Sequence, residues 1–289
     1  MAFTGHWRQK PFPDCAENAL RQVRGTYLTY LLAGLSVACF CAMLPARAPA
    51  ANYALAEPCG LDRVDEQVTA AYIYDGDTIK LADGRKLRLV GIDTPELAHD
   101  FRPAQPLAKQ ARKALARLVP LHDRLYLRYD KTRQDAYHRT LAHLFLEDGT
   151  NVQREMLASG LARVLAIPPN VWQIECYLAA EATAQTAKRG LWALRRYQPV
   201  DAETLMPGEK GFRLVVGQVH RVAEDRNALW LHLTDRVVLQ VPRADLPYFT
   251  DHFPTTFKKR RLLARGWLTP LGNDLRMTIR HPAALRLFD

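Results

Sequence analysis

The stretch YDGDTIKLADGRKLRLVGIDTPE, Tyr74–Glu96, decides the fold of this chain. It contains two Asp-Gly pairs, at 75–76 and 83–84, and apolar residues alternate with polar ones around them. An Asp-Gly pair between alternating runs is typical of a tight turn that joins antiparallel strands. We therefore expect a β-meander with strands at Val68–Tyr74, Thr78–Leu81 and Lys86–Ile92.

The segments after this meander predict two more strands and three helices. Five short strands with helices between them indicate a mainly β, α+β fold built on a small OB-type barrel. The strands are expected at Arg124–Tyr129 and Thr140–Leu146, and the helices at Pro103–Val119, at Ile174–Arg189, and from a capping box at Thr150 and Gln153 to Ser159.

A second region follows this barrel. Residues 197–211 are interrupted by prolines and glycines, so we interpret them as a linker. About five further strand-like runs over 212–289 predict a second, smaller OB-like β-barrel. The predicted domains are therefore 57–196 and the basic region 212–289, after a leader at 1–56.

The leader places Arg21 and Arg24 before an uncharged apolar stretch, Thr26–Leu44, and small residues follow in an A-x-A pattern. This order is typical of a secretory signal peptide. The apolar stretch is also long enough to cross a bilayer, so an uncleaved inner-membrane anchor is the alternative. Under both interpretations the rest of the chain is exported, to the periplasm or the medium. Contact with the membrane is expected only if the leader is an uncleaved anchor.

Cys59 and Cys176 are the cysteines that lie outside the leader. In an oxidising compartment such a pair favours a disulfide. The alternative is two unrelated buried thiols.

The chain carries a formal net charge of +10. This balance indicates an anionic partner, either nucleic acid or a lipid surface, and a solvated basic surface without a specific partner is the alternative. Residues 207–289 hold 14 Lys and Arg against 8 Asp and Glu, a net of +6. Long-range attraction of nucleic acid is therefore expected mainly from the C-terminal third.

Three carboxylates and two guanidiniums form a candidate catalytic constellation in three short phrases: Asp77, Arg88, Asp93, Glu96 and Arg139. Hydrolysis of a phosphodiester needs a cation at the phosphoryl oxygens, donors matched to those oxygens, and a base for the attacking water. Asp77 and Asp93, with the backbone carbonyl of Thr94, would be oxygen ligands for Ca²⁺ or another divalent cation.

The remaining members of the constellation suit the other two tasks. Arg88 and Arg139 would bind the phosphate through donors that keep their charge. Glu96 would orient or deprotonate the water.

The same phrases resemble the staphylococcal nuclease (thermonuclease) family, in order and spacing, over Val68–Trp192. The metal-binding aspartate of the family's DGDT phrase falls on Asp77. Its R-x₄-D-T-P-E phrase holds a phosphate-binding arginine, the second metal aspartate and the glutamate, and these fall on Arg88, Asp93 and Glu96. The second phosphate-binding arginine, in the family's Y-G-R phrase, falls on Arg139. The resemblance implies a calcium-dependent nuclease that acts on DNA and RNA and leaves 3′-phosphate ends.

Two departures from the family pattern concern the substrate. His138 replaces the glycine of the Y-G-R phrase, and a positive φ there would carry a cost for histidine. The family prototype also has two tyrosines after a GLAKV-like phrase, whereas this chain continues from Val164 with Leu165, Ala166 and Ile167. We expect weaker nucleotide affinity or a different grip on the substrate.

Further substrate-binding candidates are basic and aromatic. Such residues are interleaved in the C-terminal region, a combination that suits single-stranded nucleic acid. The alternative is a solvated basic loop and tryptophans that belong to the core. The candidates are Tyr137, Lys258, Lys259, Arg260 and Arg261.

Three functions compete for this sequence. The first is an exported, metal-dependent endonuclease of DNA, RNA or both, without a stable protein partner. The second is a catalytically silent binding protein on the same fold, and the third is an envelope protein whose basic C-terminal region contacts anionic lipid or polymer. Glu96 favours the enzyme, because a binding module has no need to keep it with both arginines.

Overall fold

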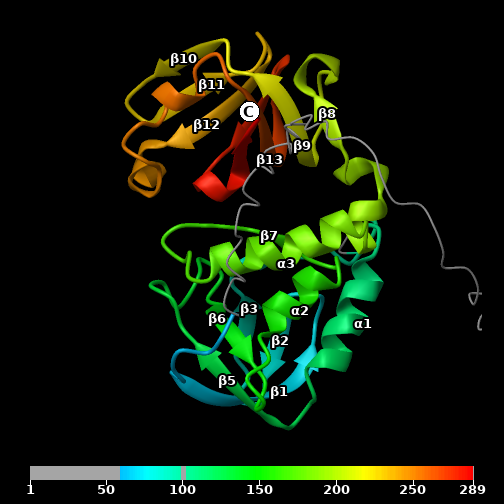
Figure 1. Cartoon of the computed structure of the whole chain (residues 1–289). Coiled ribbons are helices and arrows are strands. Elements are labelled where there is room, and N and C mark those ends of the chain that lie inside the picture. The colour runs from blue at the N-terminus through cyan, green and yellow to red at the C-terminus, as the bar shows by residue number, and fades with distance from the viewer. Residues whose placement is uncertain (1–58, 99–101, 289) are drawn as a thin grey trace, which may run out of the picture. The chain divides into compact units, whose positions relative to one another are not determined.

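The computed structural model describes residues 59–98 and 102–288 (Figure 1). The interpretation of 1–56 as a signal peptide or anchor lies outside these residues. Within the two described ranges, no helix is long and apolar enough to cross a membrane.

Five strands close into a barrel in the order β1-β2-β3-β6-β5, which confirms the predicted barrel. Strands β3 and β6 are parallel, and the other neighbours are antiparallel. Alternate residues point inward, so that Ile79 and Leu81, for example, are buried on either side of exposed Lys80. The strands are β1 (Glu66–Ile73), β2 (Thr78–Leu81), β3 (Lys86–Leu89), β5 (Arg124–Arg128) and β6 (Thr140–Phe145).

The expected strand over Lys86–Ile92 is wrong in its second half, because the chain breaks at Gly91. Gly91 has a φ of +84°, and a Cβ there would lie 2.6 Å from the Tyr177 ring. Beyond the break, β4 (Ile92–Asp93) leaves the barrel and pairs with β7 (Arg163–Val164). This turn positions the first residues of the candidate site.

Helices α1, α2 and α3 pack together beside the barrel (Figure 1). The capping box expected for α2 is wrong: Asn151 is the N-cap and accepts from the Arg154 amide, 3.0 Å away. Gln153 is instead buried and bonds the backbone of β6 and Val90. The helices are α1 (Ala108–Leu118), α2 (Val152–Ala158) and α3 (Ile174–Thr186).

A disulfide joins Cys59, just before β1, to Cys176 on α3, as predicted. The two Cα atoms are 5.7 Å apart, and the cysteines are separated by 117 residues in sequence. The bond therefore ties the start of the described chain to the last helix of the barrel region.

The C-terminal region forms a separate mixed sheet in the order β10-β11-β12-β14-β13-β9-β8, with β15 paired to β13. The segment interpreted as a linker contributes β8, which pairs in parallel with β9. The sheet has its own apolar core. Its strands are β8 (Pro199–Asp201), β9 (Gly211–Gln218), β10 (Arg221–Glu224), β11 (Ala228–His232), β12 (Val237–Pro242), β13 (Arg261–Leu271), β14 (Asp274–Thr278) and β15 (Leu285–Leu287).

A third apolar cluster is shared by the two regions. Ala184 of α3 and Trp192 belong to it together with Phe212 and Leu214 of β9. The tryptophans of the sheet do not belong to its core: Trp230 is half-buried, and Trp267 is 42% exposed.

Candidate active site

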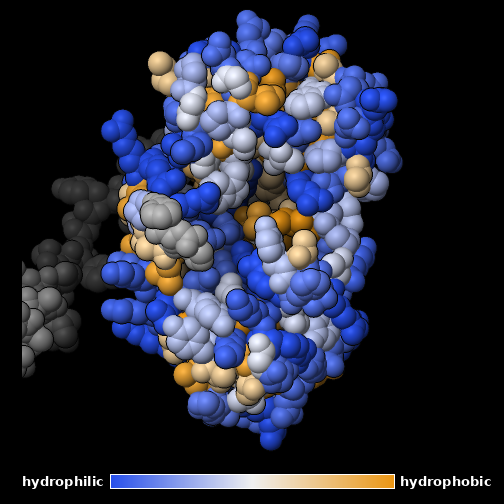
Figure 2. Space-filling view, turned by 180° about the vertical axis from the view of Figure 1, so that it is seen from behind, coloured by the Kyte–Doolittle hydropathy of each residue, from blue (hydrophilic) through white to orange (hydrophobic). Residues whose placement is uncertain are grey.

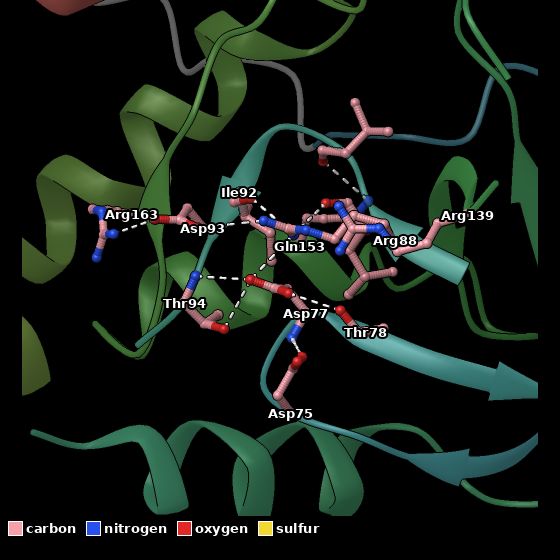
Figure 3. Close-up of polar contacts among 12 residues, drawn as sticks. Asp75, Asp77, Thr78, Arg88, Ile92, Asp93, Thr94, Arg139, Gln153 and Arg163 are labelled. Carbon is pink, nitrogen blue, oxygen red and sulfur yellow. Dashed lines mark hydrogen bonds and ion pairs between the residues drawn. The ribbon is translucent and has the colours of Figure 1, made fainter. Parts of the chain in front are cut away.

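Asp77 is fixed at the entry to β2 by a dense set of hydrogen bonds (Figure 3). Its Oδ2 accepts from the Thr94 amide at 2.9 Å and from the Thr94 hydroxyl at 2.8 Å. Its own amide donates to Asp75 Oδ1 at 3.0 Å. A side chain at Gly76 would lie 2.8 Å from the Thr94 hydroxyl, so the glycine permits this close approach.

Arg88 bridges the two buried aspartates. Its Nη1 lies 3.1 Å from Asp77 Oδ2, and its Nη2 lies 3.3 Å from Asp93 Oδ1. Nη1 also donates to the backbone carbonyls of Leu89 and Ile92. The guanidinium is thus held in one orientation by groups from β3 and β4.

Asp93 lies between two arginines, Arg88 on one side and Arg163 on the other (Figure 3). Arg163 donates from Nη2 to Asp93 Oδ2, across 70 residues of sequence. Burial raises the pKa of Asp93, and both guanidiniums act against that rise.

Asp77 and Asp93 fit a hard cation that is held by few protein oxygens. Asp93 accepts one hydrogen bond at each oxygen, so lone pairs remain on both, and Asp77 Oδ1 accepts only from Thr78 among the described residues. No group of three or more His, Cys, Asp and Glu side chains arranged for a metal occurs in the described part of the chain. A bound ion would therefore complete its shell with the Thr94 carbonyl, water or substrate oxygens.

Further carboxylates increase the negative charge around this position. Burial, and then repulsion from Asp77, raises the pKa of Asp75 to about 6. Glu96 follows β4 and is exposed at the surface. Its pKa is nevertheless raised, first by partial loss of hydration and then by repulsion from Asp77, Asp93 and Asp75. A cation at this cluster would offset the repulsion.

Arg139 lies in a loop before β6 that is ordered by Asp135. Asp135 accepts from the amides of Tyr137 and Arg139, each at 2.9 Å, and from Arg139 Nε at 2.7 Å. His138 has a φ of 59°, the conformation that the family's glycine would favour. Tyr137 is 81% exposed, and Arg139 lies over its ring.

A cavity of ≈430 Å³ is lined by both predicted arginines, Arg88 and Arg139. Tyr137 also lines it. Leu165 and Ile167, which follow the GLAKV-like phrase, form part of its wall, and no tyrosine of that segment lines it. The cavity therefore offers two guanidiniums and an apolar wall to a ligand.

The basic candidates of the C-terminal region lie elsewhere. Lys258, Lys259 and Arg260 are exposed in the turn before β13. Arg261 pairs with Asp201, 3.3 Å away. Within the described residues, none of the four lines the cavity that holds Arg88 and Arg139.

Comparison with known proteins matches residues 86–194 to the family described as "Staphylococcal nuclease homologue". The chain is 37% identical over 139 residues to a thermonuclease of Staphylococcus hyicus, an alignment that covers 46% of this chain and 80% of that protein. The chain belongs to the staphylococcal nuclease family. Residues beyond 194, which include every strand of the C-terminal sheet, lie outside the matched range.

Other members of the staphylococcal nuclease family show similar agreement. The thermonuclease of Staphylococcus intermedius is 36% identical over 124 residues, 42% of this chain and 72% of that protein. Endonuclease YncB of Bacillus subtilis is 36% identical over 135 residues, 45% of this chain and 63% of that protein. These homologues are nucleases, which hydrolyse phosphodiester bonds.

Arg163 is a site residue that the sequence did not predict. It occupies the position of the lysine in the family's GLAKV-like phrase. This replacement of lysine by arginine was the one feature of the sequence that pointed to the residue. A lysine ammonium is a point charge, whereas a guanidinium can bind a carboxylate and a second acceptor at once.

Proposed function

We propose that this chain is an exported, metal-dependent nuclease that hydrolyses phosphodiester bonds of DNA, RNA or both. The observation that carries the proposal is the position of Arg88. It bridges two buried aspartates at 3.1 and 3.3 Å and lines the same cavity as Arg139. Kinship with thermonucleases and endonucleases supports this assignment.

Asp77 and Asp93, with the Thr94 carbonyl, would hold the divalent cation, for which Ca²⁺ is the first candidate. A bound cation would polarise the phosphoryl oxygens and offset the charge that develops on them. The chain itself contributes a rigid pair of carboxylates, because Thr94 and Arg88 fix Asp77 before any ligand binds.

The remaining roles follow from position and charge. Arg88 and Arg139 would bind the phosphate in the cavity and stabilise the transition state. Glu96 is exposed beside the carboxylate cluster, and from there it would orient or deprotonate a water. Tyr137, exposed at the cavity, would contact the base or sugar of the substrate.

The C-terminal sheet is proposed to be a second OB-like barrel that contacts nucleic acid. Only Val219 and His220 separate β9 from β10. If β9 and β10 are counted as one strand, the strand order of the C-terminal sheet repeats the order β1-β2-β3-β6-β5 of the first barrel. The parallel pair β12–β14 then corresponds to β3–β6.

Surface chemistry supports a nucleic-acid partner for this region. It combines a net charge of +6 with exposed Trp267 and with exposed basic residues in the turn before β13 and at the first position of that strand: Lys258, Lys259, Arg260 and Arg261. The face of the molecule drawn in Figure 2 is largely hydrophilic, with apolar residues in small patches. We expect electrostatic binding that weakens with salt.

Export is proposed from the leader sequence, and the Cys59–Cys176 disulfide supports an oxidising compartment. The periplasm and the medium both fit, with inner-membrane attachment if the leader is retained.

The test is cleavage of single-stranded DNA and RNA by the full chain, in Ca²⁺ and in chelator. We expect cleavage that chelator, Arg88→Ala or Glu96→Gln abolishes. Arg124→Ala is the matched arginine control, because Arg124 is exposed on β5 and pairs with Glu147. Binding without cleavage at every divalent cation tried would favour the silent binding protein instead.

A further inference from the structure

Arg163 is a buried cation, and most of the side chains that surround it lie outside residues 86–194, the range that matches the family. It is 2% exposed, and its Nη1 donates to the Tyr197 hydroxyl at 3.2 Å. Its guanidinium lies 4.5 Å from the Phe212 ring and 5.2 Å from the Trp267 ring. All three aromatic residues follow residue 194, where the family match ends.

The backbone of Arg163 is paired directly with that of Asp93. Strands β4 and β7 are two residues long, and their register places Asp93 opposite Arg163 and Ile92 opposite Val164. The Leu165 amide adds one bond to the Gly91 carbonyl at 3.0 Å. Such a short pair cannot be stable by itself and depends on what packs around it.

A second contact from the C-terminal sheet supports the same strand. Arg265 of β13 donates from Nη1 and Nη2 to the two carboxylate oxygens of Glu181 on α3. Glu181, 1% exposed, also accepts from the Val164 amide at 2.7 Å. Arg265 therefore acts on β7 through Glu181 and also directly, because its Nη2 donates to the Val164 carbonyl at 3.4 Å.

Phe212 connects the two arginines. Its ring lies 4.5 Å from the guanidinium of Arg163 and 5.9 Å from that of Arg265. A buried guanidinium is costly unless its charge and its donors are compensated. Here Asp93, the Tyr197 hydroxyl and the aromatic faces supply that compensation.

We propose that Arg163 is a positioning residue that fixes the orientation of Asp93, and that the C-terminal sheet, through Phe212, Trp267 and Arg265, is a structural part of the nuclease site. The sheet then has a role in catalysis apart from any contact with substrate. The inference rests on the proposed function, since Asp93 is taken to bind the cation.

The test compares Phe212→Leu with Phe249→Leu in the full chain. Both phenylalanines are buried in the C-terminal region, at 5% and 9% exposure, but Phe249 packs on Phe253, within the core of the sheet. Neither change alters the charge near the carboxylates. Calorimetric titration with Ca²⁺ is expected to show about tenfold weaker binding for Phe212→Leu and no change for Phe249→Leu, because partners of a ligand typically affect metal affinity by 10–100-fold.

A second measurement needs no metal. Hydrogen exchange of the metal-free protein should show faster exchange in 91–94 and 163–165 for Phe212→Leu than for Phe249→Leu. Arg163→Lys should also weaken Ca²⁺ binding, because a single ammonium nitrogen does not reproduce the two separate contacts that Nη1 and Nη2 make with the Tyr197 hydroxyl and Asp93.

The outcomes separate the two proposals. If the unchanged protein binds neither Ca²⁺ nor any other divalent cation tried, the proposed metal dependence fails and hydrogen exchange alone decides the positioning role. Equal exchange in the two variants, or equal Ca²⁺ affinity where the unchanged protein binds the ion, would overturn the role of Arg163 and the sheet.

Discussion

Arg88 Nη2 lies 3.3 Å from Asp93 Oδ1, although the two residues belong to strands with different partners. Arg88 is on β3 in the barrel, and Asp93 is on β4, which pairs with β7. The break at Gly91 brings them together, because it turns the chain out of the barrel before Asp93. The site thus depends on the backbone between its residues as much as on the residues themselves.

Arg88→Lys should reduce kcat about 10²–10³-fold, the usual effect of removing one preorganised donor to a transition state. An ammonium cannot contact Asp77, Asp93 and a phosphate in the geometry of the guanidinium. Steady-state cleavage of a short oligonucleotide measures the change. If Arg124→Lys lowered kcat equally, the effect would not be specific to the site.

Gly91→Ala should destabilise the fold more than Gly84→Ala. Both glycines have positive φ, +84° and +91°, so each substitution carries strain of roughly 1–2 kcal/mol. At Gly84 a Cβ would meet no described atom within 4 Å, whereas at Gly91 it would collide with Tyr177. Overpacking of this kind costs about 1–3 kcal/mol more. Urea unfolding of the two variants gives the difference directly, and equal midpoints would contradict the account.

The barrel strands could be predicted because their alternation is a local property of the sequence. Burial alternates through β2 and β3 as the apolar pattern requires. The break at Gly91 could not be predicted in the same way, because Leu89, Val90 and Ile92 continue an apolar run on both sides of it. The need for glycine arises from the Tyr177 ring, which lies far along the chain.

The proximity of three residues of the candidate constellation was predictable because its phrases are short and keep their spacing. Asp77, Arg88 and Asp93 do meet in the structure. Arg163 could not be assigned from the sequence, since its partner is 70 residues away and its aromatic neighbours lie in another region. Gln153 was misread for a related reason, because tertiary contacts direct its side chain inward instead of to the helix start.

Replacing both Cys59 and Cys176 by serine should lower the free energy of unfolding by up to about 4–5 kcal/mol. The bond closes a loop of 117 residues, and loss of that constraint increases the entropy of the unfolded chain. Thermal unfolding of the double variant in non-reducing buffer measures the loss. The unchanged protein should fall to the same midpoint in reductant, and a midpoint that reductant leaves unmoved would show that the bond does not form.

His143 should make the fold less stable as the pH falls below neutrality. Burial, with the nearby Arg128 cation, lowers the pKa of His143 to about 3, against which Asp62 acts weakly. Its Nδ1 lies 2.7 Å from the Tyr177 hydroxyl, and its Nε2 is buried without a hydrogen-bond partner among the described residues. A proton on the folded form would therefore be uncompensated.

The sign and size of the effect follow from linkage. An unfolded histidine titrates near pH 6.5, so between that value and the pKa of about 3 the unfolded state binds a proton that the native state does not. Stability from this residue is complete above pH 6.5 and is lost as the pH falls through that window. From pH 7 to pH 5 the loss is about 2 kcal/mol. Urea unfolding at the two pH values should show a loss about 2 kcal/mol larger in the unchanged protein and in exposed His252→Gln than in His143→Gln, because other titrating groups, Asp75 among them, act equally in all three proteins. An equal drop in all three proteins would mean that another group carries the pH dependence.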